Sequence, residues 1–176
     1  PSFSPDGTKI VFRSERDGGG IFVMESMGGS VRRITNFGFN PAWSPDGREI
    51  LCATAGIEDP QYRQVHPSQI YRIDLATLQP RPVRTEGDAV QPSWSPHGFR
   101  IAYWETSLSG QRVIWTIPAG GGEAVQVTAG TCVDWNPVWS PDGRHLYFAS
   151  DRNGITNLWR VPIDERSGSP LGEPEP

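Results

Sequence analysis

The chain has 176 residues, with 16 Lys and Arg against 20 Asp and Glu, which gives a net charge of −4. This mildly acidic balance, without a basic cluster, argues against a nucleic-acid or anionic-membrane surface. No apolar run approaches the ~18 residues that a membrane-spanning helix needs, so no membrane insertion is expected. Gly (20) and Pro (17) make about a fifth of the chain against a usual ~12%, and seven Trp and seven Phe accompany them. Many turns and many large rings are typical of short strands joined by tight corners.

A four-residue pattern recurs four times and organises the chain. It reads Ser-Pro-Asp-Gly at 4–7, 44–47 and 140–143, and Ser-Pro-His-Gly at 95–98. Proline presets φ, Asp tolerates turn conformations and Gly supplies a positive φ, so each copy predicts a tight hairpin corner. An aromatic residue precedes every corner, at Phe3, Trp43, Trp94 and Trp139.

The first unit shows the complete pattern. After its corner, residues 9–12 alternate in polarity and predict a second strand. An apolar run around Phe22 predicts a third strand, and the Gly28-Gly29 corner leads to a fourth strand that ends at Thr35. We therefore expect four short antiparallel strands in each unit.

The second unit contains an insertion. Its third-strand aromatic, Tyr71, follows the corner proline by 26 residues, whereas the other units have 17, 19 and 18. The extra residues fall between 54 and 68 and mix carboxylates with aromatic, Arg and His side chains. Loops on rigid scaffolds often carry function, although insertions there are also simply tolerated.

The third unit closes at Thr128, but the fourth unit has no matching Thr and ends in Leu-Gly-Glu-Pro-Glu-Pro. Four antiparallel strands per ~40–45 residues are the signature of a β-propeller blade. We therefore predict an all-β fold with a single propeller region over 1–176. Its blades are expected at about 1–36, 37–86, 87–129 and 130–176, the last one truncated.

No spare strand at either end completes a shared blade, so we favour part of a larger propeller of six or more blades. A true four-bladed ring is the alternative. An open arc would expose apolar blade faces larger than a monomer usually shows, and it is expected to pair with a second copy as a homodimer.

The motif P-x-W-S-P-D-G-x-x-I-x-F, followed by S-x-R-x-G at 14–18 and 150–154, resembles the TolB-like repeat, a WD-repeat-like propeller family. The resemblance covers the whole chain, although the second and third units lack S-x-R-x-G. It implies a bacterial protein and favours a periplasmic or cell-envelope location. Such blades occur in the periplasmic TolB protein, in the gating propellers of prolyl oligopeptidases and tricorn proteases, and in sensor regions of Ser/Thr kinases and transcriptional regulators.

Motifs for catalysis and metal binding are not found in the sequence. It contains no G-x-S-x-G nucleophile elbow and no C-x-x-C pair. The Asp residues of the corners are interpreted as turn residues, because His97 takes the same position in the third copy. Cys52 lies where the other units have aromatic residues, which predicts a core position. We therefore expect no catalytic residue, no metal and no cofactor in this segment.

Binding residues are expected where a propeller presents its loops. The first strand of each blade should line a central channel, with the Ser-Pro-x-Gly corners at one end, here called the turn face. The loops between second and third strands, and the segments between blades, should lie at the other end, the loop face. Candidate residues at the loop face come from these segments and from the insertion: Asn40, Gln91, Asp134, Trp135, Asn136, Glu58, Asp59, Tyr62, Arg63 and His66.

The sequence thus predicts a non-catalytic binding or scaffold module that recognises a protein, a peptide or a small polar ligand at the loop face. Two alternatives follow from the resemblance. One is a gating propeller of a prolyl-oligopeptidase-like enzyme with its catalytic domain elsewhere. The other is the sensor region of a bacterial kinase or regulator.

Overall fold

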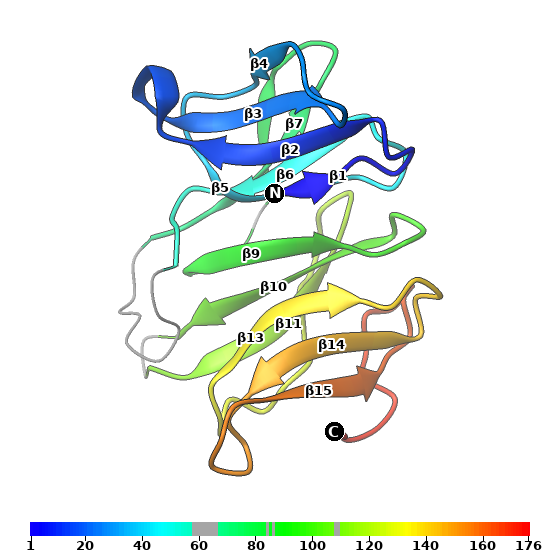
Figure 1. Cartoon of the computed structure of the whole chain (residues 1–176). Helices are drawn as coiled ribbons and strands as arrows, with labels where there is room; N and C mark the ends of the chain where they lie inside the picture. The colour runs from blue at the N-terminus through cyan, green and yellow to red at the C-terminus, as the bar shows by residue number, and fades with distance from the viewer. Residues whose placement is uncertain (58–66, 84, 86, 108–109) are drawn as a thin grey trace.

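A computed structural model describes residues 1–57, 67–83, 85, 87–107 and 110–176. Antiparallel strands form four separate sheets, each of which is one blade (Figure 1). Apart from the strands there is a short 3₁₀ turn at Arg16–Gly18. Within the described ranges, no helix is long and apolar enough to span a membrane.

Consecutive strands pair within each blade, in the order of the sequence. Blade 1 contains β1 (Ser2–Phe3), β2 (Lys9–Ser14), β3 (Gly20–Glu25) and β4 (Val31–Arg33). Blade 2 contains β5 (Phe39–Trp43), β6 (Glu49–Ala53), β7 (Ile70–Asp74) and β8 (Pro80–Val83). Blade 3 contains β9 (Ala89–Trp94), β10 (Arg100–Thr106), β11 (Arg112–Pro118) and β12 (Val125–Gln126). Blade 4 contains β13 (Asp134–Trp139), β14 (His145–Ser150) and β15 (Asn157–Pro162).

The Ser-Pro-Asp-Gly corners share one hydrogen-bond pattern. In blade 1, Ser4 Oγ donates to Asp6 Oδ1 at 2.6 Å, the Thr8 N–H donates to the same oxygen at 3.0 Å, and the Lys9 N–H donates to Ser4 Oγ at 2.9 Å. The corners of blades 2 and 4 repeat these bonds. The bonds from Ser4 and Thr8 lower the pKa of the Asp6 carboxyl to about 2. The Asp residue at the corner is therefore a structural acceptor.

The corner of blade 3 obtains its carboxylate from another blade. Glu165, in the segment that follows β15, accepts the His97 N–H at 2.9 Å and lies 2.6 Å from His97 Nδ1. Burial raises the pKa of Glu165, but its hydrogen bonds with His97 and Ser95 outweigh burial and hold that pKa below its usual value. The His-for-Asp exchange thus links blades 3 and 4.

Replacing this carboxylate should produce a pH-dependent loss of stability. Because the folded pKa of Glu165 is depressed, its contribution is present above the unfolded pKa and is lost as pH falls through the folded value. We expect Glu165→Gln to cost about 1 kcal/mol at neutral pH and almost nothing in acid. Thermal unfolding at both pH values measures this, with the exposed Glu173→Gln as control. An equal cost of Glu165→Gln at both pH values would contradict the assignment.

The blades pack in sequence order into an open arc. The first strands follow one another, with β1 against β5, β5 against β9, and β9 against β13. Blades 1 and 4 lie at opposite ends of the arc (Figure 1), so the alternative of a closed four-bladed ring is wrong. Phe3 shows the effect of the open end: it is 63% exposed, whereas Trp43, at the same place in blade 2, is buried and its Nε1 donates to Ser2 O of blade 1.

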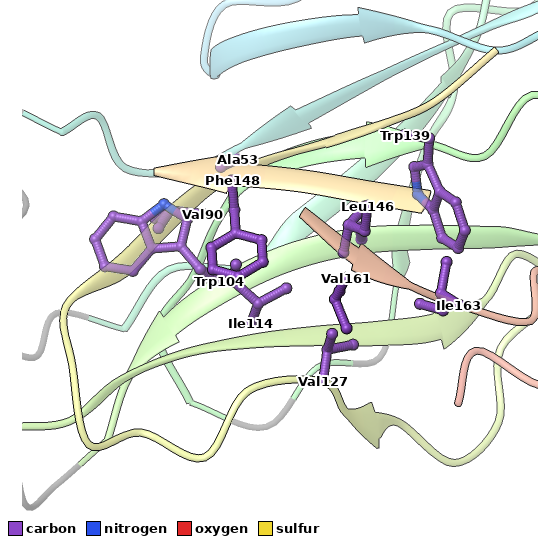
Figure 2. Close-up of a cluster of buried hydrophobic side chains, with 11 residues drawn as sticks. Ala53, Val90, Trp104, Ile114, Val127, Trp139, Leu146, Phe148, Val161 and Ile163 are labelled. Atoms are coloured by element: carbon purple, nitrogen blue, oxygen red, sulfur yellow. The ribbon is translucent and has the colours of Figure 1, made fainter. Parts of the chain in front are cut away.

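Apolar cores fill the spaces between neighbouring blades. The core between blades 3 and 4 contains Trp104 and Ile114 from blade 3 and Phe148 from blade 4 (Figure 2). Cys52 lies in the core between blades 1 and 2, as predicted, and burial raises the pKa of its thiol to about 12. Cys52 and Cys132 are both free thiols.

Candidate functional site

The turn face and the loop face of the arc differ as the sequence predicts. In Figure 1 the corners that join first and second strands lie on the right, and the second strands end and the third strands begin on the left. The segments between blades return to the left end as well. This left end is the loop face, and the first strands β5, β9 and β13 reach it with their N-terminal residues.

Three of those first strands carry a non-glycine residue in the left-handed conformation. Asn40, Gln91 and Asn136 have φ values of 51°, 47° and 55°, and each directly precedes a proline. At the same points the pairing of first and second strands shifts register. A non-glycine residue in this region costs on the order of 1 kcal/mol, and such strain and bulges concentrate at functional sites. The same feature thus recurs in blades 2, 3 and 4.

The side chains of these three residues are all carboxamides. Asn40 and Asn136 are exposed, whereas Gln91 is half-buried and its Oε1 accepts a hydrogen bond from Trp104 Nε1 at 2.6 Å. A carboxamide carries both donors and an acceptor, which match the two polar groups of a peptide bond. The set can therefore bind main-chain groups without a charge on either partner.

Two other predicted residues, Asp134 and Trp135, contact neighbouring side chains of the fold. Asp134 is 1% exposed, and its Oδ1 accepts from Arg152 Nη2 at 3.0 Å. The guanidinium of Arg152 also lies over the rings of Phe148 and Trp159. Trp135 is half-buried against the core between blades 3 and 4. We therefore interpret Asp134 as a residue that positions Arg152 rather than one that contacts a ligand.

The five candidates in the insertion, Glu58, Asp59, Tyr62, Arg63 and His66, lie outside the described residues. The base of the insertion is described and is closed by hydrogen bonds. The Ala55 N–H donates to Ser68 Oγ at 3.2 Å, and the Gln69 N–H donates to Thr54 Oγ1 at 3.0 Å. The described residues on the two sides of the insertion are thus paired with each other.

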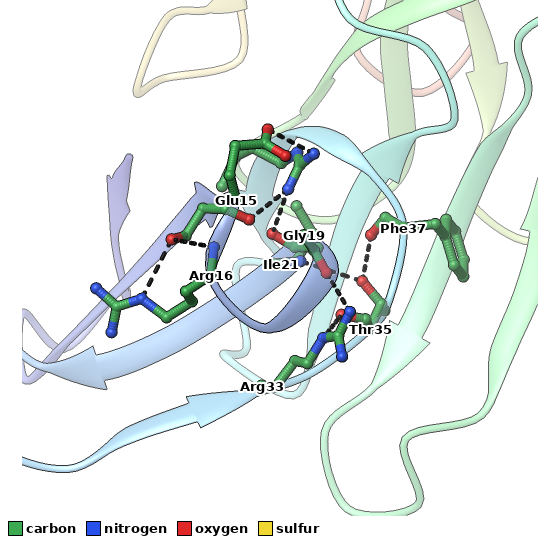
Figure 3. Close-up of polar contacts among 10 residues, drawn as sticks. Glu15, Arg16, Gly19, Ile21, Arg33, Thr35 and Phe37 are labelled. Carbon is green, nitrogen blue, oxygen red and sulfur yellow. Dashed lines mark hydrogen bonds and ion pairs between the residues drawn. The ribbon is translucent and has the colours of Figure 1, made fainter.

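An arginine cluster at the loop end of blade 1 was not among the predicted residues (Figure 3). Arg13 pairs with Glu15 at 2.7 Å and lies over the ring of Phe39 in blade 2. Arg16 Nε donates to Ser14 Oγ at 3.2 Å, and Arg33 Nε donates to Thr35 O at 3.1 Å. Arg152 and Ser150 repeat the contact of Arg16 and Ser14 in blade 4. The S-x-R-x-G repeats contained this signal, because an internally repeated Arg after Ser indicates a shared contact.

The pKa shifts of acidic groups belong to the turn face. The pKa values of Asp6, Asp46, Asp142 and Glu165 are lowered, and in each case by hydrogen bonds that build a corner. Among the described residues, no three His, Cys, Asp or Glu side chains are grouped so that they could hold a metal ion. The titratable groups of the turn face thus report turn structure, and the loop face offers uncharged amides and paired arginines.

Comparison with known proteins gives the family. A model of the tricorn protease N-terminal β-propeller domain matches residues 1–170. The chain belongs to this family. The TolB-like resemblance seen in the repeats is confirmed by a TolB homolog of Chlorobium chlorochromatii, which is 30% identical over 150 residues. That match covers 83% of this chain and 32% of the relative.

Two further comparisons agree with this family. The Tol-Pal system protein TolB of Anaeromyxobacter dehalogenans (strain 2CP-C) is 31% identical over 133 residues, which are 76% of this chain and 27% of that protein. The solved structure of a putative TolB from Agrobacterium tumefaciens superposes with a TM-score of 0.79 at 24% identity, over 98% of this chain and 62% of that one. The chain therefore spans 32% of the length of the Chlorobium TolB homolog and 27% of that of the Anaeromyxobacter TolB. An open arc agrees with part of a propeller.

Proposed function

We propose that this propeller segment is a non-catalytic recognition module that binds an extended peptide or protein segment at the loop face, around the mouth of the central channel. The observation that carries the proposal is the threefold repetition of a strained carboxamide residue, at Asn40, Gln91 and Asn136. One such residue would be a local irregularity. Three in equivalent strands bring amide groups to one end of the channel.

The nature of the relatives supports a protein partner. One relative is a component of the Tol-Pal system, and the family is named after the propeller of a protease. Carboxamides recognise peptide main chain through paired donors and acceptors, and their binding should depend little on salt. Phe39 and Trp135, which flank the carboxamides along β5 and β13, are half-buried and add apolar surface beside them.

A second candidate function is a gate that selects peptides for a peptidase in the same protein, and the family name favours it. The loop face would bind peptide in both cases, so the two functions share one surface. The relatives described above give the sensor alternative no support. Pairing of open arcs into a homodimer stays a prediction.

The carboxamide side chains should be removable without loss of the fold. Glycine adopts left-handed φ without strain. The free energy of unfolding of the double variant Asn40→Gly/Asn136→Gly is therefore expected to lie within about 1 kcal/mol of the wild-type value. Asn40→Val should cost more, about 1–2 kcal/mol, because a β-branched residue is disfavoured there. Urea unfolding curves measure both, and a harmless Asn40→Val would show that the left-handed conformation is not required.

The binding proposal itself is tested by selection. The immobilised chain is panned against a library of random peptides, and the double glycine variant is used for a parallel selection. We expect enrichment of peptides on wild type that the double variant fails to retain. If the same peptides are enriched on both proteins, the carboxamides do not form the binding surface.

A further inference from the structure

The second strands of blades 2, 3 and 4 differ at one position near the loop face. Blades 2 and 4 have alanine there, Ala53 and Ala149, whereas blade 3 has Trp104. In each blade this position pairs with the residue that directly precedes the carboxamide of the first strand. Blades 2 and 4 have asparagine as that carboxamide residue, and blade 3 has the longer Gln91. Blade 3 thus differs from its neighbours at two adjoining positions at once.

A hydrogen bond joins these two residues of blade 3. Trp104 is fully buried between blades 3 and 4, and its Nε1 donates to Gln91 Oε1 at 2.6 Å. An indole N–H can only donate, so the group that faces it must be the carbonyl oxygen of the amide and not the amide nitrogen. The alanines of blades 2 and 4 carry no such donor. The longer carboxamide therefore occurs where a side-chain donor is present to hold it.

The amide nitrogen of Gln91 is left free by this bond. The oxygen and nitrogen of a carboxamide lie on opposite sides of one carbon, so Nε2 is turned away from the indole when Oε1 faces it. Nε2 donates to no group among the described residues, and it is not a buried atom. Gln91 therefore presents two N–H donors at the loop face, while its acceptor is occupied by Trp104.

The carboxamides of Asn40 and Asn136 are not held in this way. Both side chains are exposed, and neither makes a hydrogen bond within the part of the chain that the structure describes. The terminal torsion of asparagine is broad and roughly two-fold, so either residue can turn its oxygen or its nitrogen outward. Of the three carboxamides, Gln91 is thus the one with a fixed polarity.

We propose that Trp104 is a positioning residue of the loop face, which holds the Gln91 amide so that blade 3 recognises an acceptor oxygen of the bound peptide. The inference rests on the proposed recognition function and makes it more specific. An acceptor oxygen is supplied by a main-chain carbonyl or by a carboxylate. A donor that is already fixed loses little freedom on binding, so it sets which group of the peptide lies at blade 3.

The held amide is tested first on the free protein. In a proton–nitrogen correlation spectrum, Trp104→Phe identifies the indole signal of Trp104 by its loss. Gln91→Asn is one methylene too short to keep the bond, so that signal should move upfield. Gln79→Asn, at an exposed residue between β7 and β8, is the matched control and should leave it in place. An unmoved signal in Gln91→Asn would overturn the held amide, whether or not any peptide binds.

Recognition of an acceptor is tested with a peptide selected on wild type. Gln91→Glu keeps an oxygen toward Trp104 but replaces the free NH2 group by a second oxygen, so we expect at least about tenfold weaker binding. Gln79→Glu adds the same charge elsewhere and should bind as wild type does. If Gln91→Glu binds as well as wild type, acceptor recognition is wrong. The proposed function still stands in that case if Asn40→Gly/Asn136→Gly binds weakly.

A second peptide distinguishes the two sources of the acceptor. All its acidic side chains and its C-terminal carboxylate are changed to amides. A main-chain carbonyl is the acceptor if this peptide binds wild type as before and still loses affinity for Gln91→Glu. A carboxylate is the acceptor if the peptide binds wild type as weakly as the first peptide binds Gln91→Glu. Either result supports recognition of an oxygen acceptor by Gln91.

The role of Trp104 is tested by a double-mutant cycle on folded protein. Trp104→Phe removes the indole N–H and frees the Gln91 amide, so binding of the selected peptide should weaken several-fold. In the Gln91→Gly background there is no amide to position, and Trp104→Phe should then have no further effect. An equal loss of affinity in both backgrounds would show that Trp104 acts through the core alone and would overturn its positioning role.

Discussion

Trp104→Ala is expected to destabilise the protein by about 3–5 kcal/mol, which is the usual cost of deleting a large buried aromatic side chain. The Trp104 side chain is fully buried, and it packs in the core between blades 3 and 4 (Figure 2). The substitution also removes the indole N–H that bonds to Gln91 Oε1. Urea unfolding followed by circular dichroism measures the change.

Two control variants separate the parts of this effect. Trp104→Phe keeps most of the apolar volume but loses the hydrogen bond to Gln91, so it should cost clearly less. Val138→Ala removes a half-exposed side chain from β13 that does not belong to the core between blades 3 and 4. It should change the free energy of unfolding by less than about 0.5 kcal/mol. A cost of Trp104→Ala no greater than that of Val138→Ala would show that the blades do not pack through this core.

Gly20→Ala should be the most damaging glycine substitution in blade 1. Gly20 has φ +134°, and a Cβ there would lie 2.0 Å from Thr35 O, a backbone atom that cannot move aside alone. Backbone strain and the clash together predict a loss of roughly 3 kcal/mol or more. The Tm and the yield of soluble protein measure it.

Gly28→Ala is the matched control. Gly28 also has a positive φ, of +87°, but a Cβ there would meet nothing within 4 Å. Its substitution should therefore cost only the conformational strain, about 1 kcal/mol. If both variants are equally stable, the close approach of β3 to Thr35 is not a feature of the folded protein.

The fold could be predicted from the sequence because its signals are local. The Ser-Pro-Asp-Gly corners are built by hydrogen bonds within six residues, so turn chemistry and spacing were enough to place the strands. The corner at His97 differs, since its carboxylate comes from Glu165, 68 residues away. No local pattern reports such a contact. The missing Thr indicated that blade 4 differs from the other blades, but the pairing of Arg160 with Glu175 could not be seen in the sequence.

The candidate site could be predicted only in part. Asn40, Gln91 and Asn136 were identified because each precedes the proline of a first strand, yet nothing in the sequence indicates their left-handed φ. Asp134 was predicted as a candidate binding residue, and its pairing with Arg152 was not predicted. This salt bridge joins β13 to the turn that follows β14, 18 residues further along the chain, and no local pattern in the sequence reports such a contact.

The measurement that tests recognition at the loop face most directly is a calorimetric titration of a peptide selected on wild type. It is titrated into wild type, into Asn40→Gly/Asn136→Gly, and into the turn-face variant Arg144→Ala. We predict an affinity at least tenfold weaker for the double glycine variant, equivalent to about 1.4 kcal/mol, and an unchanged affinity for Arg144→Ala. Unchanged affinity for the double glycine variant with weaker binding to Arg144→Ala would place recognition at the turn face and contradict the account.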